Sequence, residues 1–339
     1  MSGQHGGRVL AAARRHGIAP ARWLDLSTGI NPRGYPVPVL AASHWHRLPE
    51  PDDALHARAA DYYGSAHLLA VAGSQAAIAW LPRLRRCCRV AIVGPTYSEH
   101  ARQWRLAGHE VLVAAADRVE AALTGPTPPQ VVVCVRPDNP TGQVLPAARL
   151  ARWQARLSAT DGWLIVDEAF VDATPQLSLA GRAGVAGLIV LRSLGKFFGL
   201  PGARVGFVFA WPALLAALAE VTEPWGVAGP ARAAATAALA DVPWQRRTRQ
   251  WLPRQAAALD AVLHRAGVPV LGGTSLFRYC RWPEDASPAA GAAVLAARLA
   301  RRGILLRRFV QPSALRIGLP AGPAALARLQ AVLEEEMCA

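Results

Sequence analysis

The stretch Leu191-Arg192-Ser193-Leu194-Gly195-Lys196-Phe197-Phe198-Gly199 holds the only lysine among the 37 basic residues of this 339-residue chain. Arginine keeps its charge and cannot form an imine at neutral pH, so a position that requires a deprotonatable amine cannot change to arginine. Apolar neighbours such as Phe197 also favour the uncharged amine. Lys196 is therefore the candidate for covalent chemistry with a carbonyl compound.

The sequence on either side of Lys196 alternates between short apolar runs and helical patterns. Strands are predicted at residues 89–93, 110–114, 130–135, 163–166, 188–191 and 205–209. Helices are predicted at residues 75–86, 99–107 and 146–157. Continuous apolar strands separated by helices indicate an α/β fold with a mostly parallel central sheet covered on both faces.

The texture of the chain changes after Trp211, where Ala, Leu and Arg dominate. Helices are predicted at 230–239 and 243–266, strands at 275–281, 304–308 and 314–317, and a final helix carries Leu326, Leu329 and Leu333 on one face. A chain of this length exceeds the usual size of one hydrophobic core. We therefore expect an N-terminal arm at 1–50, a large α/β domain at 51–225 and a small α+β domain at 226–339.

A glycine loop, Gly73-Ser74-Gln75, follows the apolar run Leu68–Val71 and opens a helical stretch. A glycine at a helix start lets backbone N–H groups approach a phosphate, whose charge the helix dipole favours. An ordinary helix N-cap explains the same residues. Ser193 and Arg204 carry the hydroxyl and guanidinium groups that would complete a phosphate site with Ser74 and Gln75.

Two further motifs follow predicted strands directly. Asp138-Asn139-Pro140-Thr141-Gly142 comes after the strand at 130–135, and Asp167-Glu168-Ala169-Phe170 comes after the strand at 163–166. Ligand sites of open α/β sheets lie at these carboxyl ends. Asn139 also fits a simple turn and Asp167 a helix N-cap, so each motif alone leaves both interpretations open.

Taken together, the order and spacing of these motifs resemble fold-type-I enzymes that use pyridoxal 5'-phosphate (PLP), in the aminotransferase superfamily. The resemblance covers nearly the whole chain. It implies the fold-type-I architecture and PLP as cofactor, with Lys196 as the Schiff-base lysine. It implies that the cofactor-binding residues are Ser74, Gln75, Tyr97, Asn139, Asp167, Ser193 and Arg204.

Individual roles follow from the same resemblance. Asp167 would keep the pyridine nitrogen protonated, Asn139 would bond the ring hydroxyl, and Tyr97 would stack on the ring. Arg316 resembles the arginine that grips the substrate carboxylate, a task that suits a bidentate guanidinium. Without the other motifs, Tyr97 is also consistent with a half-buried loop tyrosine and Arg316 with a strand-edge surface charge.

The N-terminal segment narrows the reaction class, which cofactor motifs alone do not decide. His5-Gly6-Gly7 and the stretch that ends in Asn31-Pro32 resemble the start of L-threonine-O-3-phosphate decarboxylases of cobalamin biosynthesis. That family implies conversion of L-threonine O-3-phosphate to (R)-1-aminopropan-2-ol O-2-phosphate. It implies that the substrate phosphate is bound by His5, Gly7, Asn31 and Arg307, beside Arg316. An ordinary turn and a solvated strand charge are the alternatives for His5, Gly7 and Arg307.

Two positions depart from the expected pattern. Aminotransferases usually have tyrosine where Phe170 stands, so a hydrogen bond to the ring hydroxyl is missing and Asn139 becomes its expected donor. Relatives often carry a tyrosine at the place of Leu48 that reaches the cofactor phosphate of the partner subunit. A histidinol-phosphate-type aminotransferase and a regulator with an aminotransferase-like ligand domain remain the alternative functions.

Charge and cysteine content exclude other classes of protein. The net charge is +14, but its arginines are scattered and form no basic block, which argues against nucleic-acid binding. No apolar run approaches membrane-spanning length, and residues 1–20 have no hydrophobic signal core. The cysteines form no metal-ligand spacing and are typical of reduced thiols. We expect a cytoplasmic homodimer without metal, its active site near the subunit interface. These cysteines are Cys87, Cys88, Cys134, Cys280 and Cys338.

Overall fold

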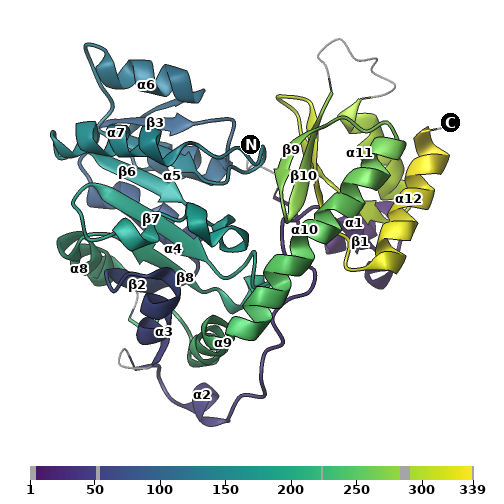
Figure 1. Cartoon of the computed structure of the whole chain (residues 1–339), viewed down its shortest axis with the longest axis horizontal. Helices are drawn as coiled ribbons and strands as arrows, with labels where there is room; N and C mark the ends of the chain where they lie inside the picture. Colours follow the sequence, from purple (N-terminus) through teal and green to yellow (C-terminus); the bar gives the residue numbers. More distant parts are fainter. Residues whose placement is uncertain (1–4, 51–53, 223, 283–290, 338–339) are drawn as a thin grey trace. The chain divides into compact units, whose positions relative to one another are not determined.

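A computed structural model describes residues 5–50, 54–222, 224–282 and 291–337, which fold into two compact units (Figure 1). The first unit takes its residues from Met1–Arg33, Pro140–Gly142 and Arg247–Ala339, and the second from Gly34–Asn139 and Gln143–Arg246. These units are divided at other residues than the expected domain boundaries at 50 and 225. The domain boundaries themselves stay predictions.

A seven-stranded sheet forms the centre of the second unit. Its strands lie in the order β2-β8-β7-β6-β5-β3-β4, and β4, β3, β5, β6 and β7 are parallel, which confirms the predicted α/β fold. Every residue of β5 and β6 is buried. The strands are β2 (Leu68–Val71), β3 (Arg89–Val93), β4 (Glu110–Ala114), β5 (Val131–Val135), β6 (Trp163–Asp167), β7 (Leu188–Ser193) and β8 (Gly206–Phe209).

Strand β8 runs antiparallel to both of its neighbours, β7 and β2. A parallel connection needs a crossover of a dozen or more residues, usually a helix. Between Ser193 and Gly206 the chain forms only one 3-10 turn, Pro201–Ala203, so β8 returns beside β7 in the opposite direction. Ser193, Lys196 and Arg204 all belong to this short return.

Helices of the second unit pack along the sheet and complete its core. Ile78, Trp104 and Ile165 are among the core side chains that are almost fully buried, and each such burial contributes roughly 1.5–3 kcal/mol. Helix α4 ends before the predicted residue 86 because Pro82 follows, and the chain continues as a 3-10 turn, Leu81–Leu84. The helices are α2 (Ser43–His46), α3 (Ala54–Tyr63), α4 (Ser74–Trp80), α5 (Ser98–Leu106), α6 (Ala116–Thr124), α7 (Ala147–Ser158), α8 (Pro212–Val221) and α9 (Gly229–Ala240).

The first unit contains an antiparallel sheet in the order β12-β13-β10-β9 and a parallel pair, β1 with β11. Strand β9 (Val270–Thr274) is not predicted, because Gly272 and Gly273 weaken its strand pattern. The predicted strand at 304–308 divides into β11 and β12. The remaining strands are β1 (Leu24–Asp25), β10 (Phe277–Arg281), β11 (Ile304–Leu305), β12 (Arg307–Phe309) and β13 (Ala314–Gly318).

The helices of the first unit include α1 (Val9–His16), α11 (Ala292–Arg301) and α12 (Pro323–Met337). Leu329 and Leu333 of α12 are fully buried and Leu326 is half-buried, in agreement with the predicted apolar face. Helix α10 (Val242–Arg265) begins in the second unit and continues into the first. None of the helices in the described part of the chain has the length and apolar character that crossing a membrane requires.

Candidate active site

Four of the predicted site residues lie where the parallel strands of the seven-stranded sheet end. Asp167 ends β6, and the strand register pairs it with Val135 of β5 and Leu191 of β7. Tyr97, Asn139 and Lys196 follow the carboxyl ends of β3, β5 and β7. These strand ends are where open α/β sheets bind their ligands. The predicted positions are therefore brought together by the parallel register.

Asp167 is buried, and each oxygen of its carboxylate has a polar contact. Its Oδ2 lies 3.0 Å from Nε2 of His100, and its Oδ1 accepts a hydrogen bond of 3.0 Å from the backbone N–H of Ala169. A buried carboxylate is costly unless it is paired, and His100, itself only 1% exposed, supplies a partner. An Asp167 held in this way suits the protonated nitrogen of a pyridine ring.

His100 is not among the predicted site residues. It follows Tyr97 by three positions: Tyr97 directly precedes α5, and His100 lies in the first turn of that helix. Tyr97 donates its hydroxyl hydrogen to Oε1 of Gln75 at 3.1 Å, and its ring is 6.1 Å from that of His100. The short spacing from Tyr97 is a local signal, but the contact with Asp167 brings α5 to the end of β6 and depends on tertiary packing.

A close backbone crossing at Gly206 brings the phosphate-site candidates together. Gly206 pairs with Val71 of β2 on one side and with Ser193 of β7 on the other. A Cβ atom at Gly206 would lie 2.4 Å from the backbone nitrogen of Ser74 and 2.8 Å from the carbonyl oxygen of Arg192. Only glycine permits this approach, so the loop at Ser74 and the end of β7 meet at β8.

Arg204, two residues before the start of β8, is the third of the phosphate-site candidates that meet here. Its backbone is left-handed, with φ of 53°, and a Cβ at Gly73 would lie 2.7 Å from its Nη2. The hydroxyl Oγ of Ser193 accepts a hydrogen bond of 3.2 Å from the N–H of Gly195. A guanidinium beside serine hydroxyls and backbone N–H groups is a donor set that fits a phosphate. We call Ser74, Ser193 and Arg204 the phosphate cup.

Lys196 lies in the return that joins Ser193 and Arg204 of the phosphate cup. Its side chain is half-buried, and Nζ is 5.3 Å from the centre of the Phe170 ring. Phe170 is 2% exposed and forms an apolar wall beside the lysine. The donor set of the cup, the buried Asp167 and this half-buried amine together fit a phosphorylated pyridine aldehyde.

Glu168, the neighbour of Asp167, has a different environment. It is fully buried and accepts hydrogen bonds from Ser178 Oγ at 2.6 Å and from the N–H of Leu179 at 2.7 Å. Arg192 Nη1 lies 2.9 Å from Glu168, and the same guanidinium pairs with Asp172. Burial raises the pKa of Glu168, and the ion pair with Arg192 opposes that rise without cancelling it. These contacts tie the end of β6 to β7.

The predicted substrate residues all belong to the first unit. Arg307 and Arg316 are directly opposite each other on β12 and β13, and therefore share one face of that sheet. Arg316 is 7% exposed and its Nη2 donates to the carbonyl oxygen of Ser27 at 3.0 Å. Two neighbouring guanidinium groups suit a substrate with two anionic groups.

Ser27 also connects the N-terminal motif to this sheet. Its Oγ accepts a hydrogen bond of 2.7 Å from the N–H of Gly7, while His5 is exposed nearby in sequence. Asn31 is buried, and its Oδ1 accepts a hydrogen bond of 2.9 Å from the N–H of Arg33. The structure thus adds Ser27, which is not predicted, as the residue that links Gly7 with Arg316.

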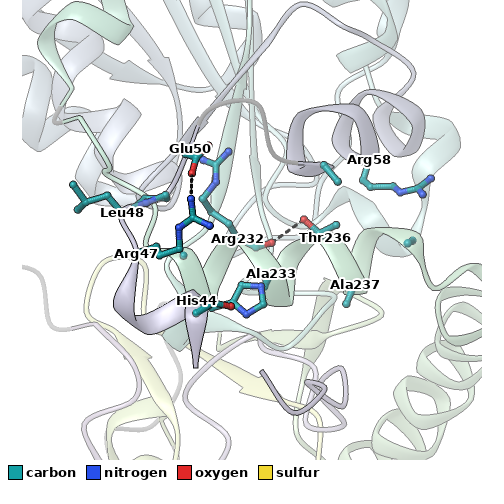
Figure 2. Close-up of a pocket in the computed structure, with 14 residues that line it drawn as sticks. His44, Arg47, Leu48, Glu50, Arg58, Arg232, Ala233, Thr236 and Ala237 are labelled. Carbon is teal, nitrogen blue, oxygen red and sulfur yellow. Dashed lines mark hydrogen bonds and ion pairs between the residues drawn. The ribbon is translucent and has the colours of Figure 1, made fainter. Parts of the chain in front are cut away.

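Leu48, the second position that departs from the expected pattern, lies on the surface of the second unit and is 64% exposed. It lines a pocket of about 710 Å³ together with Arg47, Arg58 and Arg232 (Figure 2). Arg47 forms an ion pair of 3.0 Å with Glu50 at this pocket. The pocket is formed by α2, α3, α9 and the segment between α2 and α3.

The parallel sheet, the lysine after β7 and the phosphate cup are features of a PLP-dependent enzyme of fold type I. Comparison with known families agrees with this class. The family model described as aminotransferase class I and II matches residues 22–330, and the chain belongs to this family. A threonine-phosphate decarboxylase of Pseudomonas aeruginosa is 50% identical over 97% of this chain and 97% of its own length. A threonine-phosphate decarboxylase of a Sinorhizobium species is 44% identical over 96% of both chains.

A solved structure shares the same fold. The histidinol-phosphate aminotransferase of Sinorhizobium meliloti, determined in complex with pyridoxal-5'-phosphate, superimposes with a TM-score of 0.82 at 22% sequence identity. The similarity covers 97% of this chain and 94% of that structure. Its fold is the fold-type-I architecture that the sequence motifs predict, and that prediction is confirmed.

Proposed function

We propose that this protein is a PLP-dependent decarboxylase that converts L-threonine O-3-phosphate to (R)-1-aminopropan-2-ol O-2-phosphate in cobalamin biosynthesis. The observation that carries the proposal is the 50% and 44% identity to two threonine-phosphate decarboxylases over nearly the full chain. The carboxyl ends of the parallel strands and the paired arginines of the first unit supply the groups that this reaction needs.

Each cofactor residue has a role that its environment supports. The phosphate cup would hold the PLP phosphate, and Asn139 would donate to the ring hydroxyl oxygen. Asp167, oriented by His100, would pair with the pyridine nitrogen, and Tyr97 with its bond to Gln75 would cover one face of the ring. When bound, PLP withdraws electrons from the bonds at the substrate Cα.

Lys196 and the substrate arginines select the bond that breaks and the fate of the proton. The arginines would orient the substrate carboxylate, and this orientation would favour loss of carbon dioxide over loss of a proton. We assign Arg316 to the carboxylate, and Arg307 with His5, Gly7 and Asn31 to the phosphate. Lys196 Nζ would return a proton to Cα after carbon dioxide leaves.

We also propose that the enzyme is a cytoplasmic homodimer. Val39, Trp45 and Leu48 are strongly exposed apolar residues within one short segment, and Leu48 lines the pocket of Figure 2. Apolar side chains gathered at a surface favour a protein partner over water. Cys87, Cys88, Cys134 and Cys280 are free thiols, which suits a reducing compartment.

One assay tests the reaction. The purified protein with PLP is incubated with L-threonine O-3-phosphate, and release of carbon dioxide is measured without any added 2-oxo acid. The proposal expects release and formation of the amino alcohol phosphate. No release, together with a pyridoxamine form that reacts with 2-oxo acids, would instead support a histidinol-phosphate-type aminotransferase. DNA binding in a gel shift, without turnover, would support a regulator.

The lysine is tested separately by borohydride reduction followed by intact-mass measurement. Wild-type protein is expected to gain the mass of one reduced cofactor on Lys196. Lys196→Ala is expected to gain none and to lose the absorbance of the lysine-bound cofactor. An adduct that persists in Lys196→Ala contradicts the assignment of this residue.

A further inference from the structure

The backbone that carries Lys196 is flanked by glycines on both sides. Gly195 precedes the lysine, and Gly199, with φ of 64°, follows three residues later. Glycine has more backbone freedom than any other residue, so a loop bounded by two of them needs other contacts to adopt one conformation. Phe197 and Phe198 lie between these glycines and are both fully buried.

Trp244, in the first turn of α10, packs against both phenylalanines. Its ring centre is 5.7 Å from that of Phe198, with the planes stacked at 14°, and 5.5 Å from that of Phe197, at a steep angle. Trp244 is only 9% exposed. Its backbone N–H donates to Oδ1 of Asp241 at 2.9 Å, which fixes the start of the helix.

Two tyrosines hold the same residues from other sides. The ring of Tyr35 meets that of Trp244 edge-on at 5.3 Å, and the N–H of Tyr35 donates to the carbonyl oxygen of Phe198 at 2.8 Å. The ring of Tyr62 lies 5.6 Å from that of Phe198. We call Tyr35, Tyr62, Phe197, Phe198 and Trp244 the aromatic clamp. Among these rings, Trp244 is the one in contact with both residues that follow the lysine and with Tyr35.

We propose that Trp244 is a positioning residue for Lys196, which it holds in place through Phe197 and Phe198. The proposal rests on the proposed function, in which Lys196 Nζ bonds to the aldehyde carbon of PLP and one water molecule leaves. A lysine amine ends a long flexible side chain, so its reach depends on where the backbone lies. A displacement of about 1 Å can reduce the rate of a positioned reaction by about a hundredfold.

Hydrogen exchange and chemical trapping test this role in the full-length protein. Trp244→Leu removes the stacked ring, and Trp244→Phe keeps an aromatic ring. Trp153→Leu is the matched control, because Trp153 is also buried but lies on α7 and belongs to no part of the clamp. Backbone exchange of residues 194–199 is followed by mass spectrometry, and attachment of added PLP to Lys196 is trapped with borohydride at successive times.

Trp244→Leu is expected to speed exchange in residues 194–199 and to slow attachment of PLP by about tenfold or more. Trp244→Phe is expected to restore most of the wild-type rate. Trp153→Leu is expected to lower the melting temperature without changing either measurement. If Trp244→Leu does not fold, Trp244→Met serves in the same comparison.

Equal effects of Trp244→Leu and Trp153→Leu on the loop and on attachment would overturn the positioning role. So would unchanged attachment in Trp244→Leu. Failure of the proposed function gives a different result, since wild-type protein would then form no trapped adduct at all. In that case no variant would form a trapped adduct either, and both the proposed function and the positioning role would be rejected.

Discussion

Oδ2 of Asp167 lies 3.0 Å from Nε2 of His100, and both side chains are almost completely removed from solvent. The other carboxylate oxygen accepts the N–H of Ala169. The orientation of Asp167 is therefore fixed from two directions. A preorganised charge of this kind stabilises an opposite charge without reorganisation when the ligand binds.

Replacing His100 tests how much this orientation matters. His100→Phe removes the partner of Asp167 while it keeps a ring of similar width. We expect weaker PLP binding by about tenfold and slower carbon dioxide release, because truncating one partner of a buried hydrogen bond costs about 1–3 kcal/mol. Cofactor affinity is measured by absorbance titration.

A second buried histidine provides the control for that measurement. His109 is 5% exposed and lies 2.8 Å from the carbonyl oxygen of Pro82, away from the cofactor residues in sequence. His109→Phe is expected to reduce stability while PLP affinity stays at the wild-type value. Equal losses of affinity in both variants would mean that His100 acts only through stability.

The crossing at Gly206 predicts a strict requirement for glycine. Gly206→Ala places a Cβ 2.4 Å from the backbone nitrogen of Ser74, so the phosphate cup has to open. We expect PLP affinity to fall by about tenfold or more, equivalent to at least about 1.4 kcal/mol. Gly202→Ala is the matched control, since nothing lies within 4 Å of its added Cβ, and it should bind PLP normally.

Arg192 predicts a dependence of stability on pH. Arg192→Met leaves Glu168 and Asp172 buried without their cation, which costs about 3–5 kcal/mol of unfolding free energy near neutral pH. The pKa of Glu168 is already raised by burial, and losing Arg192 removes the main opposing interaction. A carboxyl with a raised pKa in the folded state favours folding when it is protonated.

The stability deficit of Arg192→Met should therefore narrow as the pH falls and widen again as it rises through the folded-state pKa of Glu168. Urea unfolding between about pH 8 and pH 5 measures this change, because stability follows the difference in bound protons between the two states. A deficit that is constant over this range would show that Glu168 does not change its protonation. Arg149→Met, which removes a surface cation, should show little effect at any pH.

The proposed roles of Arg307 and Arg316 predict that one contacts the substrate phosphate and the other the carboxylate. Arg307→Gln should raise the KM for threonine phosphate and reduce the preference over unphosphorylated threonine by about tenfold or more. Arg316→Gln should impair both amino acids alike, because both carry the carboxylate. Steady-state rates of carbon dioxide release give the two ratios, and an identical preference in both variants would contradict the division.

The sheet could be predicted because its strands depend on local sequence, and the roles assigned to the cofactor residues stay predictions. Strands β3 and β4 begin and end at the predicted residues, since they are short apolar runs bounded by turns. Strand β9 could not be predicted, because Gly272 and Gly273 supply no strand signal and only pairing with β10 makes them extended.

The partners of the site residues were harder to predict, because they come together only through tertiary packing. His100 reaches Asp167 from another strand-to-helix connection, and Ser27 reaches Arg316 across 289 positions of sequence. No local pattern contains such pairs. Local sequence predicts the candidate site residues, whereas the partners that these residues contact are defined by the fold.

The antiparallel return from β7 to β8 has a consequence for the distance between Lys196 and the phosphate cup. Ser193 and Arg204 mark its two ends, Lys196 lies between them, and the pairing of Ser193 with Gly206 fixes both ends. The register of one strand pair thus sets the separation between an amine and an anion-binding group. An insertion or deletion inside this return is therefore expected to misplace the Lys196 amine relative to the proposed phosphate cup.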